Sequence, residues 1–416
     1  MNKDIRRRYV GSCYEIDAES KKPQFDITSI ILRMILFDTF ILQSNNLDEF
    51  EILVNSFGYG GVKEILSSGA LRIHSEAHAV GQTGQTGLGF RGKKKDGTPK
   101  DLLPLNSFSF DVIMHADSKK IMHRNMQKIH NISNIQHKEA IKLKRLIADN
   151  LVFYPKESTI YILNQMLNDL KNNTPNIKKA IISSAKKQLN ISSLPSEKLS
   201  YEIEVDDEND VHVNSNLSQM LGIDGNDAHK ILEKALLAIG GLNKRIETMR
   251  SFSAVTGFRE NELSIFEDKL EFLSASISPD DKEKHLSNVL SWPIFPELST
   301  AIADKKLNID TLLKVRESPE CQEFRSWLWD CDSLETEELK DRINSISAKL
   351  SLKLSGKTSK AIRWLSTTGA GFLPVVGVVA GPVLGFLDTF LLEKMLPKSG
   401  VLTFLGKQYP TIFKGT

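Results

Sequence analysis

Cysteine is scarce in this chain, and no secretory signal is legible. Only three cysteines occur among 416 residues, and none belongs to a CxxC or CxxxC pair. This excludes a disulfide framework and favours a reducing compartment. The basic N-terminus is not followed by the unbroken apolar run of a signal peptide, because Arg33 and Asp38 interrupt the first such run. We therefore expect a cytoplasmic protein.

A net charge of one sign is also lacking. The chain holds 54 Lys and Arg against 52 Asp and Glu, so its formal net charge is only +2. No global field therefore indicates a nucleic-acid partner. Locally the balance is uneven: residues 91–150 hold 13 basic and 6 acidic side chains, whereas residues 201–230 hold 8 acidic and 1 basic. We interpret both regions as solvated surface.

Enzyme and metal motifs are equally sparse. The sequence has no GxSxG or HExxH pattern. Asp206, Glu208 and Asp210 match positions 1, 3 and 5 of an EF-hand loop. However, Val211 stands where position 6 requires glycine, and Leu217 stands where position 12 requires glutamate. We exclude calcium on that ground and expect no cofactor and no resident metal. The sequence motifs do not indicate any particular reaction, so we favour a non-enzymatic role.

One short stretch comes nearest to a metal site. In a β-strand His74, Glu76 and His78 would share one face, because side chains alternate with period two. Imidazole and carboxylate groups on one face are suited to metal binding or to acid–base chemistry. We favour a structural role for them. A second histidine series, at spacing seven, is interpreted as solvated basic surface: His123, His130 and His137.

A glycine-rich stretch from Gly87 to Lys94 matches two phosphate-binding patterns, GxGxxG and GxxxxGK. Both motifs need a helix that begins at the last glycine, so that its N–H groups meet the phosphate. Here lysines, Gly97 and Pro99 follow instead. We interpret the stretch as a flexible basic surface loop. A weak anion-binding site is the alternative, formed by Gly87, Gly89, Gly92 and Lys93.

The apolar patterning predicts an α+β fold that is mainly α-helical. Asp227 is expected to cap a helix that Gly240 and Gly241 end. The other predicted elements are helices over residues 27–42, 46–56, 118–150 and 159–170, a strand over residues 107–115, and an acidic β-hairpin over residues 201–213. Together they place a small β-containing module near the N-terminus and a helical half at the C-terminus.

Four segments follow from these elements. They are an α+β module (1–116), a basic helical region that ends in the acidic hairpin (117–214), a helical domain (215–335), and an amphipathic helix with a hydrophobic helical hairpin (336–416). No periodic repeat relates one segment to another.

The most specific signal is the uncharged run Trp364–Leu387, which spans 24 residues. Gly377, Gly381 and Gly385 recur at spacing four, so on a helix they form a smooth ridge for close helix packing. Prolines divide the run, so we predict a hairpin of two helices rather than one span. In character the hairpin resembles the hydrophobic hairpins of pore-forming bacterial toxins such as colicins.

An acid-free basic segment precedes this run. An apolar stripe from Leu339 to Leu354 lies beside cations, as in helices that bind anionic membranes. Trp364 stands where an interfacial aromatic residue is expected. The predicted membrane-binding residues are Lys349, Lys353, Lys357, Lys360, Arg363 and Trp364.

We therefore predict a membrane-active effector of the toxin or bacterial-defence type. Its C-terminal hairpin would associate with or permeabilise membrane under control of the N-terminal part. The protein would be cytoplasmic and conditionally at the inner face of the membrane. Its partners would be the anionic membrane surface and either further copies of itself or a partner protein.

Two alternatives stay open. Asp388 would be costly in lipid unless paired, so the hairpin could instead be the core or subunit interface of a soluble oligomeric scaffold protein. The other alternative is a nucleic-acid-binding protein or nuclease that uses Lys93–Lys95 and the helix containing Lys138–Arg145.

Overall fold

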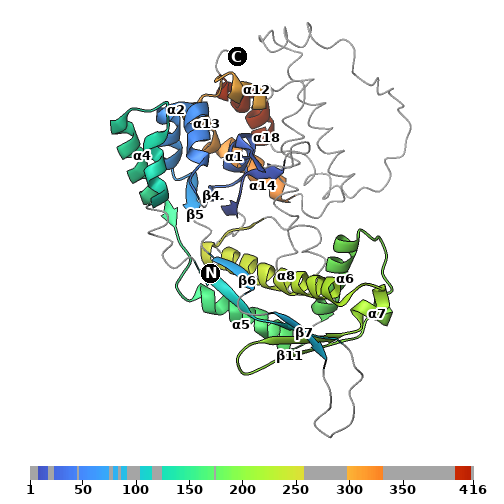
Figure 1. Cartoon of the computed structure of the whole chain (residues 1–416). Helices are drawn as coiled ribbons and strands as arrows, with labels where there is room; N and C mark the ends of the chain where they lie inside the picture. Colours follow the sequence, from blue (N-terminus) through green and yellow to red (C-terminus); the bar gives the residue numbers. More distant parts are fainter. Residues whose placement is uncertain are drawn as a thin grey trace, which may run out of the picture.

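The α+β, mainly helical class is confirmed by the computed structural model. Figure 1 shows one group of elements that includes α1 (Ile27–Leu36) and α18 (Ser399–Thr403), from the two ends of the described chain, and a second group built around the long helix α8. The structure describes residues 8–16, 23–44, 46–74, 78–82, 86–90, 104–114, 124–172, 175–256, 298–330 and 399–413.

Four parallel strands form the first sheet, in the order β1-β4-β5-β10. Helices connect the strands, as parallel neighbours require. The strands are β1 (Arg8–Gly11), β4 (Thr39–Gln43), β5 (Leu71–His74) and β10 (Leu151–Val152), and the helices between them are α1 (Ile27–Leu36), α2 (Glu49–Ser67) and α4 (His137–Asp149). Alternate side chains of β4 face opposite sides of the sheet: Phe40 and Leu42 join the first core, and Ile41 faces away from it.

Two predicted boundaries in this sheet are wrong. Residues 27–42 do not form one helix, because α1 ends at Leu36 and β4 begins at Thr39. A continuously apolar run does not distinguish a buried strand from a buried helix by periodicity. Likewise, the glycines after residue 56 do not end α2. Gly58, at φ 71°, kinks the helix, which then continues through Gly61 to Ser67.

The second sheet is antiparallel, in the order β11-β12-β8-β7. It contains β7 (Gly87–Phe90), β8 (Pro104–Phe108), β11 (Tyr201–Val205) and β12 (Val211–Ser215). The predicted acidic hairpin is confirmed as β11 and β12. The predicted strand 107–115 is instead two strands interrupted at Ser109, because β9 (Phe110–Met114) leaves this sheet to pair with β6 (His78–Gln82). A further two-stranded ladder joins β2 (Tyr14–Ile16) and β3 (Pro23–Phe25).

Helices α5 (Ser158–Lys171), α6 (Pro175–Leu189) and α8 (Gly225–Phe252) pack with the second sheet (Figure 1). The predicted helix 159–170 is thereby confirmed as α5. The prediction for α8 is wrong at both ends, because Asp224 caps it and Gly240 and Gly241 lie within it. At Gly240 an added Cβ would lie 2.5 Å from a methyl of Val80, so glycine there permits a close contact with β6.

Shorter elements complete the described chain. They are η2 (Met126–Asn131), η3 (Ser196–Lys198), α7 (Leu217–Leu221), α12 (Leu298–Ala303), α13 (Ile309–Arg316), α14 (Pro319–Asp330), α18 (Ser399–Thr403), the π-helical turn η5 (Phe404–Gln408) and η6 (Tyr409–Ile412).

Two hydrophobic cores hold these elements. The first core draws residues from all four predicted segments, from Tyr9 to Phe413. The second core lies between Phe108 and Leu242 and buries one face of α8 against α5, α6 and the second sheet. A small third cluster, which includes Val10, Ile41 and Phe252, covers the other face of the first sheet.

Among the described residues, no helix is both long enough and apolar enough to cross a bilayer. The predicted hairpin falls in residues 331–398, which lie outside that search.

Candidate functional site

Several predicted site residues lie outside the described residues, and their roles stay predictions. The membrane-binding set is Lys349, Lys353, Lys357, Lys360, Arg363 and Trp364, and the helix-packing set is Gly377, Gly381 and Gly385. Glu76, Gly92 and Lys93 also lie outside.

The predicted common strand face of His74 and His78 is not formed. His74 ends β5 in the first sheet, whereas His78 begins β6 and pairs with Met114 of β9. His74 is buried, and its Nδ1 lies 3.1 Å from the carbonyl oxygen of Val152. The rings of Tyr154 and Phe252 pack against it, with centroids 4.7 and 4.6 Å from that of His74. Within the part of the chain that the structure describes, no group of three or more His, Cys, Asp or Glu side chains is placed to hold a metal ion.

The predicted glycine-rich loop is a strand over its first half. Gly87 and Gly89 belong to β7 and pair with Ser107 and Leu105 of β8. A phosphate-binding loop would instead turn directly into a helix. The prediction of a loop is therefore wrong for Gly87–Phe90, because antiparallel pairing holds these residues extended.

Two members of the histidine series, His130 and His137, are brought together without one continuous helix, and His123 lies outside the described residues. His130 lies in η2 and His137 opens α4, so the predicted single helix over residues 118–150 is wrong. Their rings stack with centroids 5.3 Å apart, and Lys144 Nζ lies 3.2 Å from His130 Nε2. Desolvation, and then the charges of Lys144 and His137, lower the pKa of His130.

A Ser–His–Asp chain crosses the second sheet. His212 Nδ1 lies 2.9 Å from Ser107 Oγ, and its Nε2 lies 3.0 Å from Asp206 Oδ2. In a nucleophilic triad the two ring nitrogens have the opposite roles, with Nε2 toward serine. Asp206 Oδ1 also accepts from the backbone N–H groups of Glu208 and Asp210 in the β11–β12 turn. The chain therefore stabilises the turn and pairs neighbouring strands.

A buried carboxylate joins α5 to α8. Glu247 is fully buried and accepts hydrogen bonds from Ser158 Oγ at 2.5 Å and Ser251 Oγ at 2.7 Å. Arg250 adds two more, at 2.6 and 3.0 Å. Burial alone would raise the pKa of Glu247, but these hydrogen bonds outweigh it and lower the pKa. The spacing of Glu247, Arg250 and Ser251 along one helix is a signal that the sequence offered and that we did not use.

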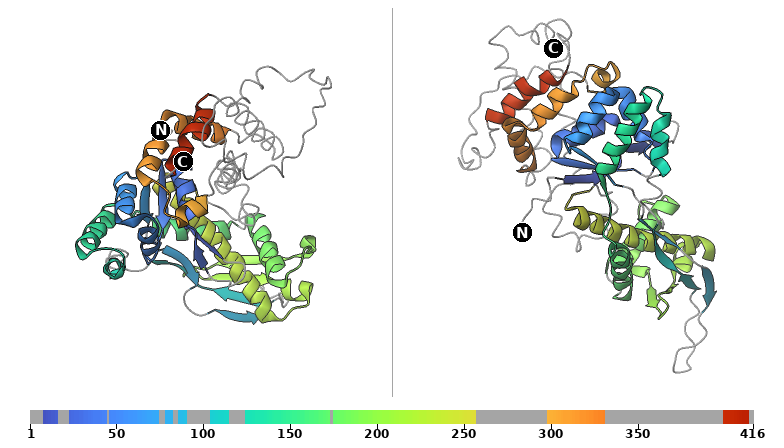
Figure 2. Two further views of the ribbon diagram at one scale, coloured as in Figure 1. Left: turned by 90° about the horizontal axis from the view of Figure 1, so that it is seen from above. Right: turned by 90° about the vertical axis from the view of Figure 1, so that its left-hand side faces the viewer.

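The chain on either side of residues 331–398 is held together in an antiparallel pair. Phe324 of α14 stacks on Phe404, with ring centroids 4.7 Å apart. Near the start of α14, Ser318 donates to Gln408, which in turn donates to Glu320 at 2.7 Å. Figure 2 shows α14 and residues 399–413 side by side. Asp330, the last described residue before residues 331–398, and Ser399, the first after them, therefore belong to the same end of this pair.

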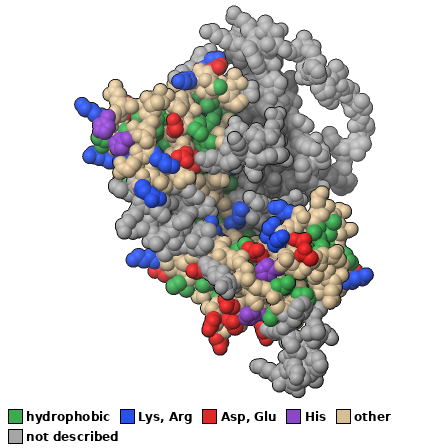
Figure 3. Space-filling view, in the orientation of Figure 1, with side chains coloured by type: hydrophobic (Ala, Val, Ile, Leu, Met, Phe, Trp, Pro, Cys, Tyr) green, Lys and Arg blue, Asp and Glu red, His purple; other side chains and the backbone are tan. Residues whose placement is uncertain are grey.

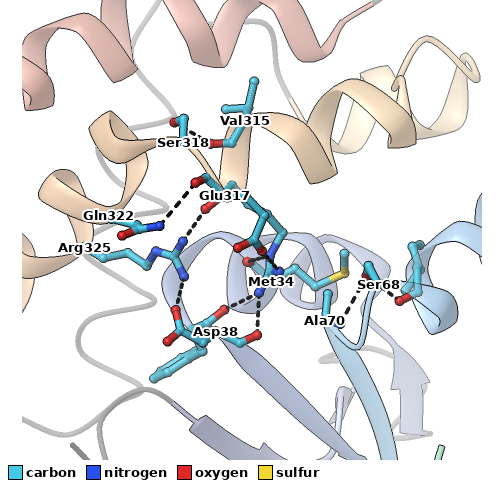
Figure 4. Close-up of polar contacts among 12 residues, drawn as sticks. Met34, Asp38, Ser68, Ala70, Val315, Glu317, Ser318, Gln322 and Arg325 are labelled. Atoms are coloured by element: carbon cyan, nitrogen blue, oxygen red, sulfur yellow. Dashed lines mark hydrogen bonds and ion pairs between the residues drawn. The ribbon is translucent and has the colours of Figure 1, made fainter.

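Two buried arginines attach this pair to the end of α1 and to the connection between α1 and β4; Figure 4 shows Arg325 beside Asp38. Arg316 donates to the carbonyl oxygens of Met34 and Phe37 at 2.9 Å each, and to that of Asp38 at 2.6 Å. These carbonyls include ones that the end of α1 leaves without helical partners. Burial lowers the pKa of Arg316, and the carboxylate of Glu317 is the largest opposing influence.

The second arginine adds a charge pair to this contact. Arg325 donates to Asp38 Oδ1 at 2.6 Å and also to the carbonyl oxygen of Arg316. We call Asp38, Arg316 and Arg325 the arginine cluster. Burial raises the pKa of the nearby Cys321 thiol to about 11, so the thiol stays protonated. No sequence pattern pointed to this cluster, because its partners are separated by 287 residues.

Comparison with known proteins gives no relative: no family model, no curated protein and no solved structure matches this chain. The candidate site is therefore defined by geometry alone. It consists of the antiparallel pair that flanks residues 331–398 and of the arginine cluster that attaches this pair to the end of α1 and to the connection between α1 and β4.

Proposed function

We propose that the protein is a membrane-active effector, in which residues 331–398 associate with or permeabilise an anionic membrane. The observation that carries the proposal is that this segment joins the uncharged, glycine-ridged run Trp364–Leu387 to an acid-free basic flank. Segments that act on anionic bilayers combine a long apolar run with a neighbouring basic stretch.

The attachment of the two flanks supports this proposal. A segment that departs from and returns to one end of an antiparallel pair enters and leaves a membrane on the same side, as a hairpin does. The arginine cluster and the Phe324–Phe404 stack keep the two ends together on the folded body. The first core thus supplies a fixed base, and the segment between the flanks supplies the membrane activity.

Dye release from vesicles tests this function. The full chain should release dye from anionic vesicles, and Gly381→Leu should abolish release because leucine blocks close approach along the glycine ridge. Gly369→Leu is the matched control, since Gly369 lies off the ridge on a helical projection and should leave release unchanged.

Two results would contradict the proposal. Absence of release by the wild-type chain would contradict permeabilisation, and absence of vesicle binding as well would contradict the membrane activity itself. Equal release by Gly381→Leu and the wild type would leave the activity but remove the packing role of the ridge. A stable oligomer that ignores vesicles would favour the scaffold alternative.

A further inference from the structure

The exposed face of α4 carries cations at helical spacing with an isoleucine among them. Lys138, Ile141, Lys142 and Arg145 follow the i, i+3, i+4, i+7 pattern, so their side chains share one face. The opposite face of α4 is buried in the first core. We call these four residues the α4 stripe.

The cations of the stripe have no acidic partner among the described residues. None of the ion pairs between described residues includes Lys138, Lys142 or Arg145. Glu139, the acid nearest in sequence to the stripe, accepts the backbone N–H of Gln136 in the capping box. The charge of the stripe is therefore available to an external anion.

The neighbourhood of the stripe is also basic. Lys144 contacts Gln127 and His130 rather than a carboxylate. In Figure 3 basic and histidine side chains gather over the edge of the molecule where Figure 1 places α4. Lys144 adds its charge to that of the stripe from the same helix, and Glu139 and Asp149 of α4 offset part of it.

The isoleucine distinguishes between anionic partners. Ile141 is 37% exposed, whereas Ala140, Leu143 and Ile147 of α4 are buried. Against the phosphate backbone of a nucleic acid, an isoleucine side chain buries little apolar surface. At a lipid headgroup layer it can enter the boundary with the acyl chains. The stems of the flanking lysines can lie along the same boundary while their ammonium groups reach the phosphates.

We propose that the α4 stripe binds the surface of an anionic phospholipid membrane, with α4 lying parallel to that surface. This inference rests on the proposed function and adds to it a docking site on the folded body, separate from residues 331–398. The stripe would hold the first core at the membrane while the segment between the flanks acts.

The test measures partition of the full chain onto phosphatidylglycerol-containing vesicles and onto phosphatidylcholine vesicles. The triple variant Lys138→Gln/Lys142→Gln/Arg145→Gln should lose roughly a hundredfold in partition onto the anionic vesicles. The matched control removes three exposed cations from the helices of the second core, Lys171→Gln/Lys187→Gln/Lys234→Gln, and should change partition by less than about threefold. Circular dichroism confirms that both triples fold.

A single substitution tests the apolar part of the stripe. Ile141→Gln should reduce partition by roughly fivefold, because it removes the side chain that enters the acyl boundary. The same variants are titrated with a double-stranded RNA. One outcome would overturn the proposal in favour of a nucleic-acid interface. In it, the wild-type chain and Ile141→Gln bind the RNA equally tightly, and neither binds vesicles.

Failure of this inference and failure of the proposed function are distinguishable. Vesicle binding that needs the stripe but is not followed by dye release keeps the stripe and sinks the permeabilising activity. Dye release at wild-type levels by the α4 triple variant keeps the activity and sinks the stripe. Equal losses in the two triple variants, or no binding of the wild-type chain to either vesicle, also overturn the stripe.

Discussion

The two hydrophobic cores are assembled in different ways. The second core uses one stretch of chain, from Phe108 to Leu242, whereas the first unites residues near the N-terminus with residues up to Phe413. Contacts within a short stretch close small loops, and contacts between chain ends close large ones. The flanks of residues 331–398 are attached to the core that depends on both ends. The first core is thus the body whose integrity governs the proposed active segment.

The largest expected effect breaks the first core alone. Arg316→Met leaves the carbonyls of Met34, Phe37 and Asp38 without their buried donor, so it should destabilise this core by about 3 kcal/mol. Urea unfolding followed by tryptophan fluorescence, to which Trp327 of the first core contributes, measures the loss.

Its control is Lys314→Met on the same helix, where the side chain is exposed. That variant should stay within about 0.5 kcal/mol of the wild type. If Arg316→Met and Lys314→Met unfold at the same urea concentration, the arginine cluster does not hold the flanks.

A smaller change in stability is expected from substitutions in α8, which belongs to the second core. At Gly240 an added Cβ would lie 2.5 Å from Val80 and 2.9 Å from Met166 Sδ, whereas at Gly241 it would meet nothing within 4 Å. Gly240→Ala should therefore destabilise the protein by about 1–2 kcal/mol, and Gly241→Ala should stabilise it by about 0.5–1 kcal/mol through helix propensity. Thermal unfolding of the two neighbours gives the sign directly, and a stabilising Gly240→Ala would refute the packing of α8 against β6.

The smallest expected effect depends on pH and concerns the α5–α8 contact. The pKa of Glu247 is lower in the folded protein than in the unfolded chain. The ionised carboxylate therefore contributes fully to the stability of the fold at a pH above the unfolded pKa, and this contribution is lost as the pH falls through the folded pKa. Glu247→Gln should destabilise by about 1 kcal/mol at pH 7 and by less at pH 3. Urea midpoints at both pH values measure this difference. An equal loss at the two pH values would show that ionisation of Glu247 contributes nothing.

Sequence patterns predicted the elements whose signals are local. The α5 helix and the β11–β12 hairpin follow from residues close to one another in the chain. Strand β4 was missed because both of its faces are buried, so its apolar run carries no alternation. The continuation of α8 through Gly240 was missed because a tertiary contact with Val80 overrides the local propensity of glycine.

The candidate site was not predicted from the sequence. The uncharged run and its basic flank are visible in the sequence, but the antiparallel attachment of their flanks depends on Phe324 and Phe404 meeting in space. The arginine cluster was beyond prediction for the same reason, since Arg325 and Asp38 are far apart in the chain. The α4 stripe was visible as charge, whereas the exposure of Ile141 required the structure.

The most direct test is co-flotation of the full chain with anionic and neutral vesicles, with dye release recorded in the same samples. The account predicts that the protein floats with anionic vesicles and releases their dye, and that raising the salt concentration weakens both. A chain that stays at the bottom of the gradient with both kinds of vesicle, while remaining folded, would contradict the proposed membrane activity.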